Sequence, residues 1–301
     1  MVCLRVLAVL ASACSALANP LIKRASLQHI TNSSISNPTN VGFYLYAPDN
    51  VNVTTKPGIV VAIHYCTGTA QAYYSGSPYA TLAEQYGFIV IYPSSPHEGT
   101  CWDVSSKATL SHNGGGDSNA IAGMVNWTVA KYNADTEKIF VTGSSSGAMM
   151  TNVLVATYPE MFKAGIVYSG VAAGCFASPS GGVDAWNYTC QIGEVTATPE
   201  GWADIVRDMD PGYNGTRPKM QIYHGTADTA LYPNNYNETI KQWAGVFDYD
   251  YTKPLKTEVD TPQTNYTRYT FGPRLQGIYA EGVGHTVPIQ GSEDMKFFGF
   301  A

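Results

Sequence analysis

The sequence predicts a single-domain α/β protein whose sheet is mostly parallel and carries helices on both faces. Apolar, strand-like runs alternate with helix-like segments along the chain, which is typical of parallel strands joined by crossover helices. The chain shows no internal repeat, no low-complexity stretch and no Ser/Thr/Pro-rich linker. A single domain, without a separate binding module, is therefore expected.

The predicted strands are short apolar runs, several of them continuous enough to be buried on both faces. They cover residues 41–47, 58–64, 88–93, 138–143, 164–169, 219–224 and 275–281. Helices are predicted between them, at residues 77–86, 117–132, 146–158, 199–209, 233–247 and 292–297. Ligands of such sheets bind beyond the carboxyl ends of the strands, so functional residues are expected in the loops that follow them.

One such loop has the sequence Gly143-Ser144-Ser145-Ser146-Gly147. It directly follows the apolar run 138–143 and precedes a helix that Pro159 ends. Gly-x-Ser-x-Gly in a strand–turn–helix context is the nucleophile elbow of α/β-hydrolases, and glycines next to the serine let strand and helix pack closely. The context predicts an α/β-hydrolase fold in which Ser145 is the nucleophile.

The partners of this serine are constrained by chain order, which in α/β-hydrolases is Ser, then Asp or Glu, then His. Asp228 lies just past the run 219–224, and His285 is the one histidine that follows it. In this arrangement His285 takes the Ser145 proton and Asp228 orients the imidazole. The backbone N–H groups of Ser146 and of Cys66, in the loop after the run 58–64, are the predicted oxyanion donors.

The amino-terminal segment predicts secretion. Residues 1–18 combine Arg5, an apolar stretch and an Ala-x-Ala ending, as a signal peptide does, and the stretch is too short to span a membrane. Residues 19–24 end in Lys23-Arg24 and are read as a possible pro-segment, which leaves 25–301 as the catalytic domain. Without residues 1–24 the chain has 14 basic and 23 acidic residues, which argues against nucleic-acid and anionic-membrane partners.

Four cysteines remain after the signal peptide, and an even number in a secreted chain suggests two disulfides with three possible pairings. Proximity favours Cys175–Cys190, which leaves Cys66–Cys101. Neither a C-x-x-C motif nor clustered histidines indicate a metal, and the glycines at 114–116 lack the Lys-Ser/Thr of a phosphate loop, so no cofactor is expected.

Two further sets of residues are assigned from their positions. Trp102 and Trp186 lie in segments expected near the site and are predicted to contact substrate, with core packing as the alternative for each. Seven Asn-x-Ser/Thr sequons predict N-glycosylation of a secreted protein: Asn32, Asn52, Asn126, Asn187, Asn214, Asn237 and Asn265.

Several motifs together resemble the fungal acetylxylan esterases of carbohydrate esterase family one, which also contains feruloyl esterases and is related to polyhydroxybutyrate depolymerases. These motifs are residues 63–69, 101–104, 143–150, 224–228 and 282–288, so the resemblance covers nearly the whole mature chain. It implies the same fold and triad, and backbone donors at Cys66 and Ser146. Family members commonly have His-Gly-Cys where this chain has His64-Tyr65-Cys66.

The leading hypothesis is therefore a secreted esterase that removes acetyl groups from plant cell-wall xylan. Only about 80 residues separate Ser145 from Asp228, which leaves little chain to cover a long acyl group. A feruloyl esterase, a short-chain polyester depolymerase and a serine peptidase use the same triad. A non-catalytic carbohydrate-binding protein on this scaffold is the alternative from another class, and the complete triad argues against it.

Overall fold

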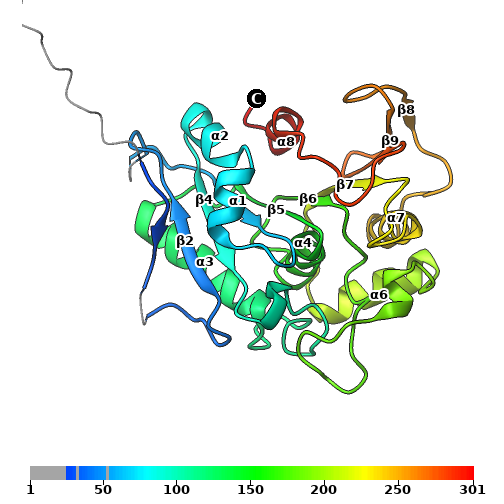
Figure 1. Cartoon of the computed structure of the whole chain (residues 1–301), viewed down its shortest axis with the longest axis horizontal. Helices are drawn as coiled ribbons and strands as arrows, with labels where there is room; N and C mark the ends of the chain where they lie inside the picture. Colours follow the sequence, from blue (N-terminus) through cyan, green and yellow to red (C-terminus); the bar gives the residue numbers. More distant parts are fainter. Residues whose placement is uncertain (1–24, 32–33, 52–53) are drawn as a thin grey trace, which may run out of the picture.

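A computed structural model describes residues 25–31, 34–51 and 54–301 of the chain (Figure 1). The predicted signal peptide, the pro-segment and the sequon residues Asn32 and Asn52 lie outside the described residues. The described strands form one sheet in the order β1-β2-β4-β3-β5-β6-β7-β10-β9-β8. Helices cover both of its faces, which confirms the predicted α/β architecture.

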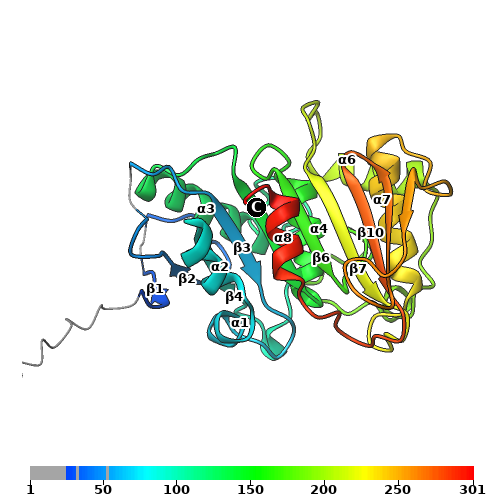
Figure 2. The same cartoon turned by 90° about the horizontal axis from the view of Figure 1, so that it is seen from above.

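The centre of the sheet is parallel. It consists of β4 (Ile89–Ser94), β3 (Ile59–Ile63), β5 (Ile139–Ser144), β6 (Ala164–Tyr168), β7 (Lys219–Gly225) and β10 (Leu275–Ala280). All six were predicted from apolar runs, and four of them, β3 to β6, are buried along nearly their whole length. Figure 2 shows several of these strands side by side, with α8 crossing in front of them.

Both edges of the sheet are antiparallel. On one side β2 (Gly42–Tyr46) pairs with β4, and β1 (Gln28–His29) pairs with β2. On the other side β9 (Tyr266–Gly272) pairs with β10, and β8 (Lys256–Glu258) pairs with β9. Because these pairings are antiparallel, the sheet as a whole is mixed. Strands β1, β8 and β9 were not predicted from the sequence.

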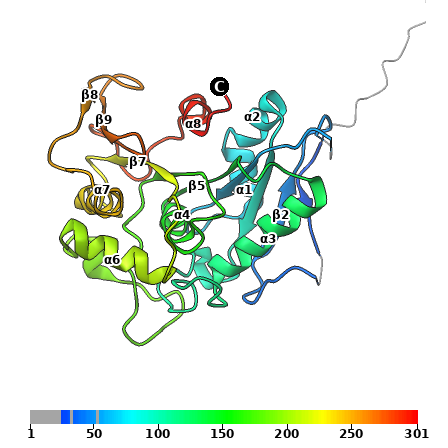
Figure 3. The ribbon, with the colours of Figure 1, turned by 180° about the vertical axis from the view of Figure 1, so that it is seen from behind.

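The helices divide between two apolar cores, one on each face of the sheet. The larger core holds α3 (Asp117–Tyr132), α4 (Ser146–Thr157), α6 (Pro199–Met209) and α7 (Asn234–Phe247). The other holds α1 (Ala70–Gly76), α2 (Tyr79–Tyr86) and α8 (Gly291–Phe298). In Figure 1, α2 and α8 lie above the sheet and α3 and α6 below it. Figure 3 shows β8 and β9 beside α7 at one edge.

The helix predictions hold for α2, α3, α4, α6, α7 and α8, although bounds shift by one to two residues at some ends. The short helices α1 and α5 (Tyr188–Gln191) and a 3₁₀ turn at Glu98–Thr100 were not predicted. Within the part of the chain that the structure describes, no helix is both long enough and apolar enough to cross a bilayer.

This topology sets the position of the candidate residues. Ser145 follows β5, Asp228 follows β7 and His285 follows β10, and these three strands run in the same direction. All three residues therefore lie at the carboxyl edge of the sheet, where α/β proteins bind their ligands.

Candidate active site

Ser145 sits on a sharp turn between β5 and α4. Its φ of 55° and ψ of −121° lie in a region that side-chain-bearing residues rarely adopt. A Cβ on Gly143 would lie 2.3 Å from the Gly147 carbonyl oxygen, and one on Gly147 would lie 2.2 Å from the Ile63 carbonyl oxygen. The two glycines therefore allow β5, α4 and β3 to approach closely, and the turn holds the Ser145 side chain above the sheet.

The structure brings Ser145, His285 and Asp228 into one chain of hydrogen bonds. His285 Nε2 lies 2.7 Å from Ser145 Oγ, and His285 Nδ1 lies 2.8 Å from Asp228 Oδ2. A carboxylate only accepts, so Nδ1 carries the imidazole proton and Nε2 is left to accept from the Ser145 hydroxyl. Ser145 is partly exposed and His285 faces solvent, so a substrate can reach both.

Asp228 is held as a carboxylate beneath His285. Its side chain is fully buried, and Oδ1 accepts hydrogen bonds from the backbone N–H groups of Ala230 and Leu231, each at 2.9 Å. Burial opposes the charged form, but the hydrogen bond and charge of His285, together with the backbone donors, hold the pKa of Asp228 below its usual value. The carboxylate stays charged and fixed in orientation at neutral pH.

The loop after β3 lies beside the serine and is anchored on both sides. Cys66 is disulfide-bonded to Cys101. The Trp102 backbone N–H donates to Ser146 Oγ at 2.7 Å. This hydrogen bond links the segment next to Cys101 to the start of α4. Ser146 is the first residue of α4, and an N–H in the first turn of a helix has no acceptor within the helix. The Ser146 N–H is therefore available to a ligand.

His64 supports the same loop, a role that the sequence analysis missed. Its Nε2 accepts from the Ser95 backbone N–H at 3.1 Å, and its Nδ1 donates to the Tyr65 carbonyl at 2.7 Å. Both partners allow only one hydrogen-bond direction, so the ring is the neutral Nδ1–H tautomer. Burial lowers the pKa of His64 and favours the same neutral form. The position of His64 just after a buried strand, two residues before Cys66, was the sequence feature that could have predicted this role.

Trp102 does not fit the substrate contact predicted for it. Its side chain is 1% exposed, and its indole N–H donates to the His64 carbonyl at 2.8 Å. The ring therefore packs beneath the loop that carries Cys66 and offers no face to a substrate. Sequence position placed this residue near the site correctly, but it could not tell which way the ring points.

Trp186, in contrast, is 56% exposed. It lies in the loop closed by the disulfide Cys175–Cys190, after β6, and its indole N–H donates to Gln191 Oε1 at 2.8 Å. The Phe176 ring meets it edge to face, with 5.0 Å between ring centroids. The indole is held in place while its surface stays open, so its predicted contact with substrate remains a prediction.

Asp103 joins the Cys101 segment to the Cys175–Cys190 loop, a role that was not predicted from the sequence. This carboxylate is 2% exposed and accepts hydrogen bonds from Ser105, Ser106 and Thr109. It also accepts the Asp184 backbone N–H at 3.1 Å, from the Cys175–Cys190 loop. Despite burial, these donors keep the pKa of Asp103 below its usual value. A charged Asp103 therefore fixes the Trp186 loop against the Cys101 segment.

One group of possible metal ligands lies among the described residues, namely His112, Glu160 and Asp210. His112 Nδ1 donates to the Thr157 carbonyl at 2.6 Å, at the far end of α4 from Ser145. Twelve residues of helix separate the two places, which is about 18 Å. This group is therefore not part of the candidate active site, and the expectation of a metal-free reaction stays a prediction.

Comparison with known proteins gives the family. The model of the esterase PHB depolymerase family matches residues 41–243. Acetylxylan esterase A of Aspergillus ficuum is 66% identical over 279 residues, which are 93% of this chain and 91% of that protein. A probable acetylxylan esterase A of Neosartorya fischeri is 66% identical over 280 residues, which are 93% of this chain and 75% of that protein.

Solved structures agree with this result. The acetyl xylan esterase of Aspergillus awamori superposes with a TM-score of 0.89 at 66% identity, over 92% of this chain and 100% of that chain. The esterase PE8 superposes with a TM-score of 0.51 at 16% identity, over 84% of this chain and 97% of that chain, and shares the fold alone. The chain belongs to the esterase PHB depolymerase family and has the α/β-hydrolase fold.

Proposed function

We propose that this member of the family is a secreted serine esterase that removes acetyl groups from acetylated xylan. The hydrogen-bond chain from Asp228 through His285 to Ser145 is the observation that carries the proposal. The substrate comes from the relatives at 66% identity that are named acetylxylan esterases.

Acylation uses the three residues as one unit. Ser145 Oγ attacks the acetyl carbonyl carbon while His285 Nε2 takes the hydroxyl proton. Asp228 accepts the hydrogen bond from Nδ1 and stabilises the imidazolium that forms. When the ester bond breaks, His285 gives the proton to the departing sugar oxygen. The products are a free xylose hydroxyl and an acetyl group on Ser145.

The negative charge that develops on the carbonyl oxygen needs donors that are already in place. We assign the backbone N–H groups of Ser146 and Cys66 to this task. The free first-turn N–H of α4 supports the first assignment, and the disulfide that holds Cys66 supports the second.

Deacylation repeats the proton transfers with water. His285 Nε2 removes a proton from a water molecule, whose oxygen attacks the acetyl carbon. The bond to Ser145 Oγ breaks, the serine recovers its proton from His285, and acetate leaves. No step requires a metal or an organic cofactor.

We further propose that the enzyme acts outside the cell on a neutral polymer. Trp186 offers an exposed ring, in the loop that follows β6, for a sugar or an acetyl group. Of the sequon residues that the structure describes, Asn126, Asn214, Asn237 and Asn265 are exposed and Asn187 is half-buried. Exposed sequons fit glycosylation during secretion.

The test compares acetate release from acetylated xylan with release of ferulate from methyl ferulate. We expect the wild-type protein to prefer the acetylated polymer, and we expect Ser145→Ala to lose activity by about 10⁴-fold or more while staying folded. Ser180→Ala, in an exposed turn of the Cys175–Cys190 loop, is the matched control. Faster cleavage of methyl ferulate would favour a feruloyl esterase. Failure of an organophosphate to label Ser145 would favour a non-catalytic binding protein.

A further inference from the structure

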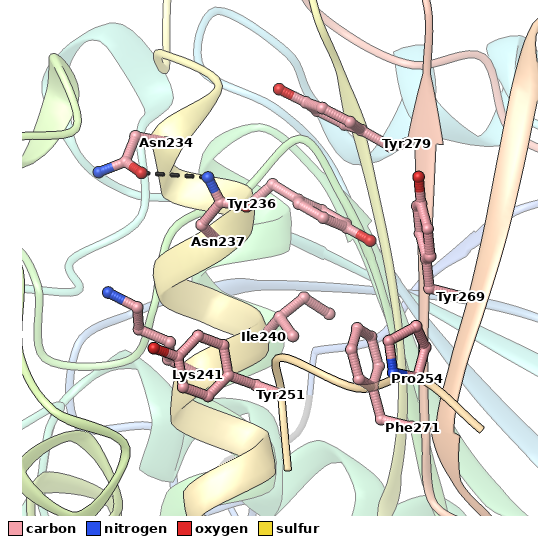
Figure 4. Close-up of a pocket in the computed structure, with 10 residues that line it drawn as sticks. All are labelled: Asn234, Tyr236, Asn237, Ile240, Lys241, Tyr251, Pro254, Tyr269, Phe271 and Tyr279. Atoms are coloured by element: carbon pink, nitrogen blue, oxygen red, sulfur yellow. Dashed lines mark hydrogen bonds between the residues drawn. The ribbon is translucent and has the colours of Figure 1, made fainter. Parts of the chain in front are cut away.

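A hollow lies at one edge of the sheet, and none of the three candidate catalytic residues lines it. It is a cavity of about 430 Å³ between α7, the loop that precedes β8, and strands β9 and β10. Figure 4 shows aromatic rings on three sides of it. The rings are Tyr236, Tyr251, Tyr269, Phe271 and Tyr279.

The rings form an apolar floor and a polar rim. Tyr236 and Phe271 are buried, whereas Tyr251, Tyr269 and Tyr279 are half-buried. Tyr236 and Tyr279 stack with 4.7 Å between centroids and 11° between planes. Pyranose sugars present flat C–H faces that pack on aromatic rings, and hydroxyl groups at their edges that bond to polar side chains. The lining has both features.

Tyr236 carries a hydrogen-bonding group that the protein does not use. Its hydroxyl is buried and has no hydrogen-bond partner among the described residues. A Cβ on Gly277 would lie 2.2 Å from this hydroxyl, so the glycine provides its space. Figure 4 shows the hydroxyl directed toward Tyr269. Burial raises the pKa of Tyr236 well above its usual value, so the hydroxyl remains a donor at every working pH.

The lining suits an uncharged ligand. Lys241 is the charged residue among those that line the cavity, and its Nζ lies 2.7 Å from Glu238 Oε1. This ion pair neutralises the cation, so the cavity has no free charge to select an acid. The amides of Asn234 and Asn237 add neutral donors and acceptors at the rim.

The cavity adjoins the elements that carry the candidate triad. Helix α7 begins six residues after Asp228, and β10 ends five residues before His285. Asn234 Nδ2 donates to the Gly193 carbonyl at 2.7 Å, so the rim of the cavity contacts the segment that follows the Cys175–Cys190 loop. The cavity is therefore lined by elements that begin or end within a few residues of Asp228 and His285.

We propose that this cavity is a second binding site for the uncharged main chain of xylan, separate from the site of ester cleavage. The choice of xylan rests on the proposed function, while the sugar-binding character rests on the rings, the free Tyr236 hydroxyl and the neutral lining. The site holds the polymer so that successive acetyl groups reach Ser145.

The test measures binding apart from turnover, in full-length Ser145→Ala protein titrated with xylohexaose in a calorimeter. Tyr269→Ala and Tyr251→Ala should each weaken binding about 3- to 10-fold, which is the usual range for loss of one stacking ring. Tyr251 lies in a loop, so its variant tests the site without disturbing a strand. In the active protein the same changes should raise KM for acetylated xylan and leave kcat/KM for p-nitrophenyl acetate unchanged.

Tyr213→Ala is the matched control, because this half-buried tyrosine precedes β7 at the opposite end of the strands. Unchanged xylohexaose affinity in both test variants would overturn the second site. The proposed function is tested separately: it stands if the wild-type protein releases acetate from xylan and fails if the protein releases none.

Because Asn237 begins a sequon at the rim, the protein is tested before and after enzymatic removal of its glycans. Xylohexaose binding that appears only after removal would show that the protein's own glycan fills the cavity, which also overturns the proposal.

Discussion

Replacing Asp228 by asparagine is expected to remove most activity without unfolding the protein. Two backbone donors, the N–H groups of Ala230 and Leu231, meet Asp228 Oδ1 at 2.9 Å each. The asparagine oxygen must take this position, because the reverse orientation would point the amide NH₂ at two N–H groups. The NH₂ group then faces His285 Nδ1, which must become an acceptor. The imidazole proton moves to Nε2, the atom that has to accept the proton of Ser145.

The magnitude follows from this tautomer change. An imidazole in the wrong tautomer lowers kcat by about 10⁴-fold in serine hydrolases, which corresponds to about 5.4 kcal/mol of activation free energy. The folded state loses much less, because asparagine keeps both backbone hydrogen bonds and gains one to Nδ1. We expect unfolding to become easier by only about 1 to 2 kcal/mol, the difference between a charged and a neutral hydrogen bond.

Hydrolysis of p-nitrophenyl acetate and thermal unfolding are measured on the same samples. Asp260→Asn is the matched control, because exposed Asp260 also accepts one backbone N–H, from Asn265 at 2.9 Å. A variant at position 228 that kept more than about one hundredth of kcat would refute the tautomer argument. A large loss of stability with the same loss of activity would show that Asp228 acts mainly on the fold.

Four further predictions concern the disulfide, a buried carboxyl, the need for a metal and the substrate range. Replacing Cys66 and Cys101 together by serine should cost about 2 to 4 kcal/mol of stability and also lower kcat, because the proposed oxyanion donor at Cys66 is loosened. Thermal unfolding measures the loss of stability, and an unchanged kcat would exclude a catalytic role for this disulfide. Burial raises the pKa of Asp294 to about 7, above its unfolded value, so the folded state binds this proton more tightly and stability falls as pH rises from about 4 to about 7. Asp294→Asn mimics the protonated carboxyl, so its free energy of unfolding should rise relative to that of the wild type by about 2 to 3 kcal/mol between pH 5 and pH 7. Urea unfolding measures both proteins, and parallel curves of stability against pH would contradict this prediction. EDTA should leave activity unchanged, and kcat/KM should fall from p-nitrophenyl acetate to butyrate to octanoate; a rise with chain length would indicate a lipase-like enzyme.

The sequence predicted the centre of the sheet better than its edges. A strand buried on both faces needs a continuous apolar run, and β3 (Ile59–Ile63) provides one without interruption. The edge strand β8 is three residues long and largely exposed, so no apolar pattern marks it. Strand β9 was a different case. Its Tyr266-Thr267-Arg268-Tyr269-Thr270-Phe271 sequence is rich in strand-forming residues, and this signal was overlooked.

The candidate site was predictable where chain order constrains it. Order and position after strands single out Ser145, Asp228 and His285, because few residues satisfy both conditions. The burial of Trp102 depends on its contact with His64, 38 residues away, which no local pattern records. Asp103 had a local signal, since its carboxylate bonds the backbone two and three residues ahead, as an aspartate in a turn commonly does.

The Cys175–Cys190 disulfide has a consequence for how this enzyme can change over generations. Both ends of the loop that carries Trp186 are fixed by this covalent bond, so residues between them that do not contact Asp103 or Ser105 can vary without moving β6 or the catalytic residues. Lengthening such a loop is inexpensive, since doubling it adds only about 0.6 kcal/mol of closure entropy. Under the proposed role of Trp186, natural selection can alter the acyl groups and sugars that the enzyme accepts by insertion and substitution inside one cross-linked segment, while the machinery of ester cleavage is inherited unchanged.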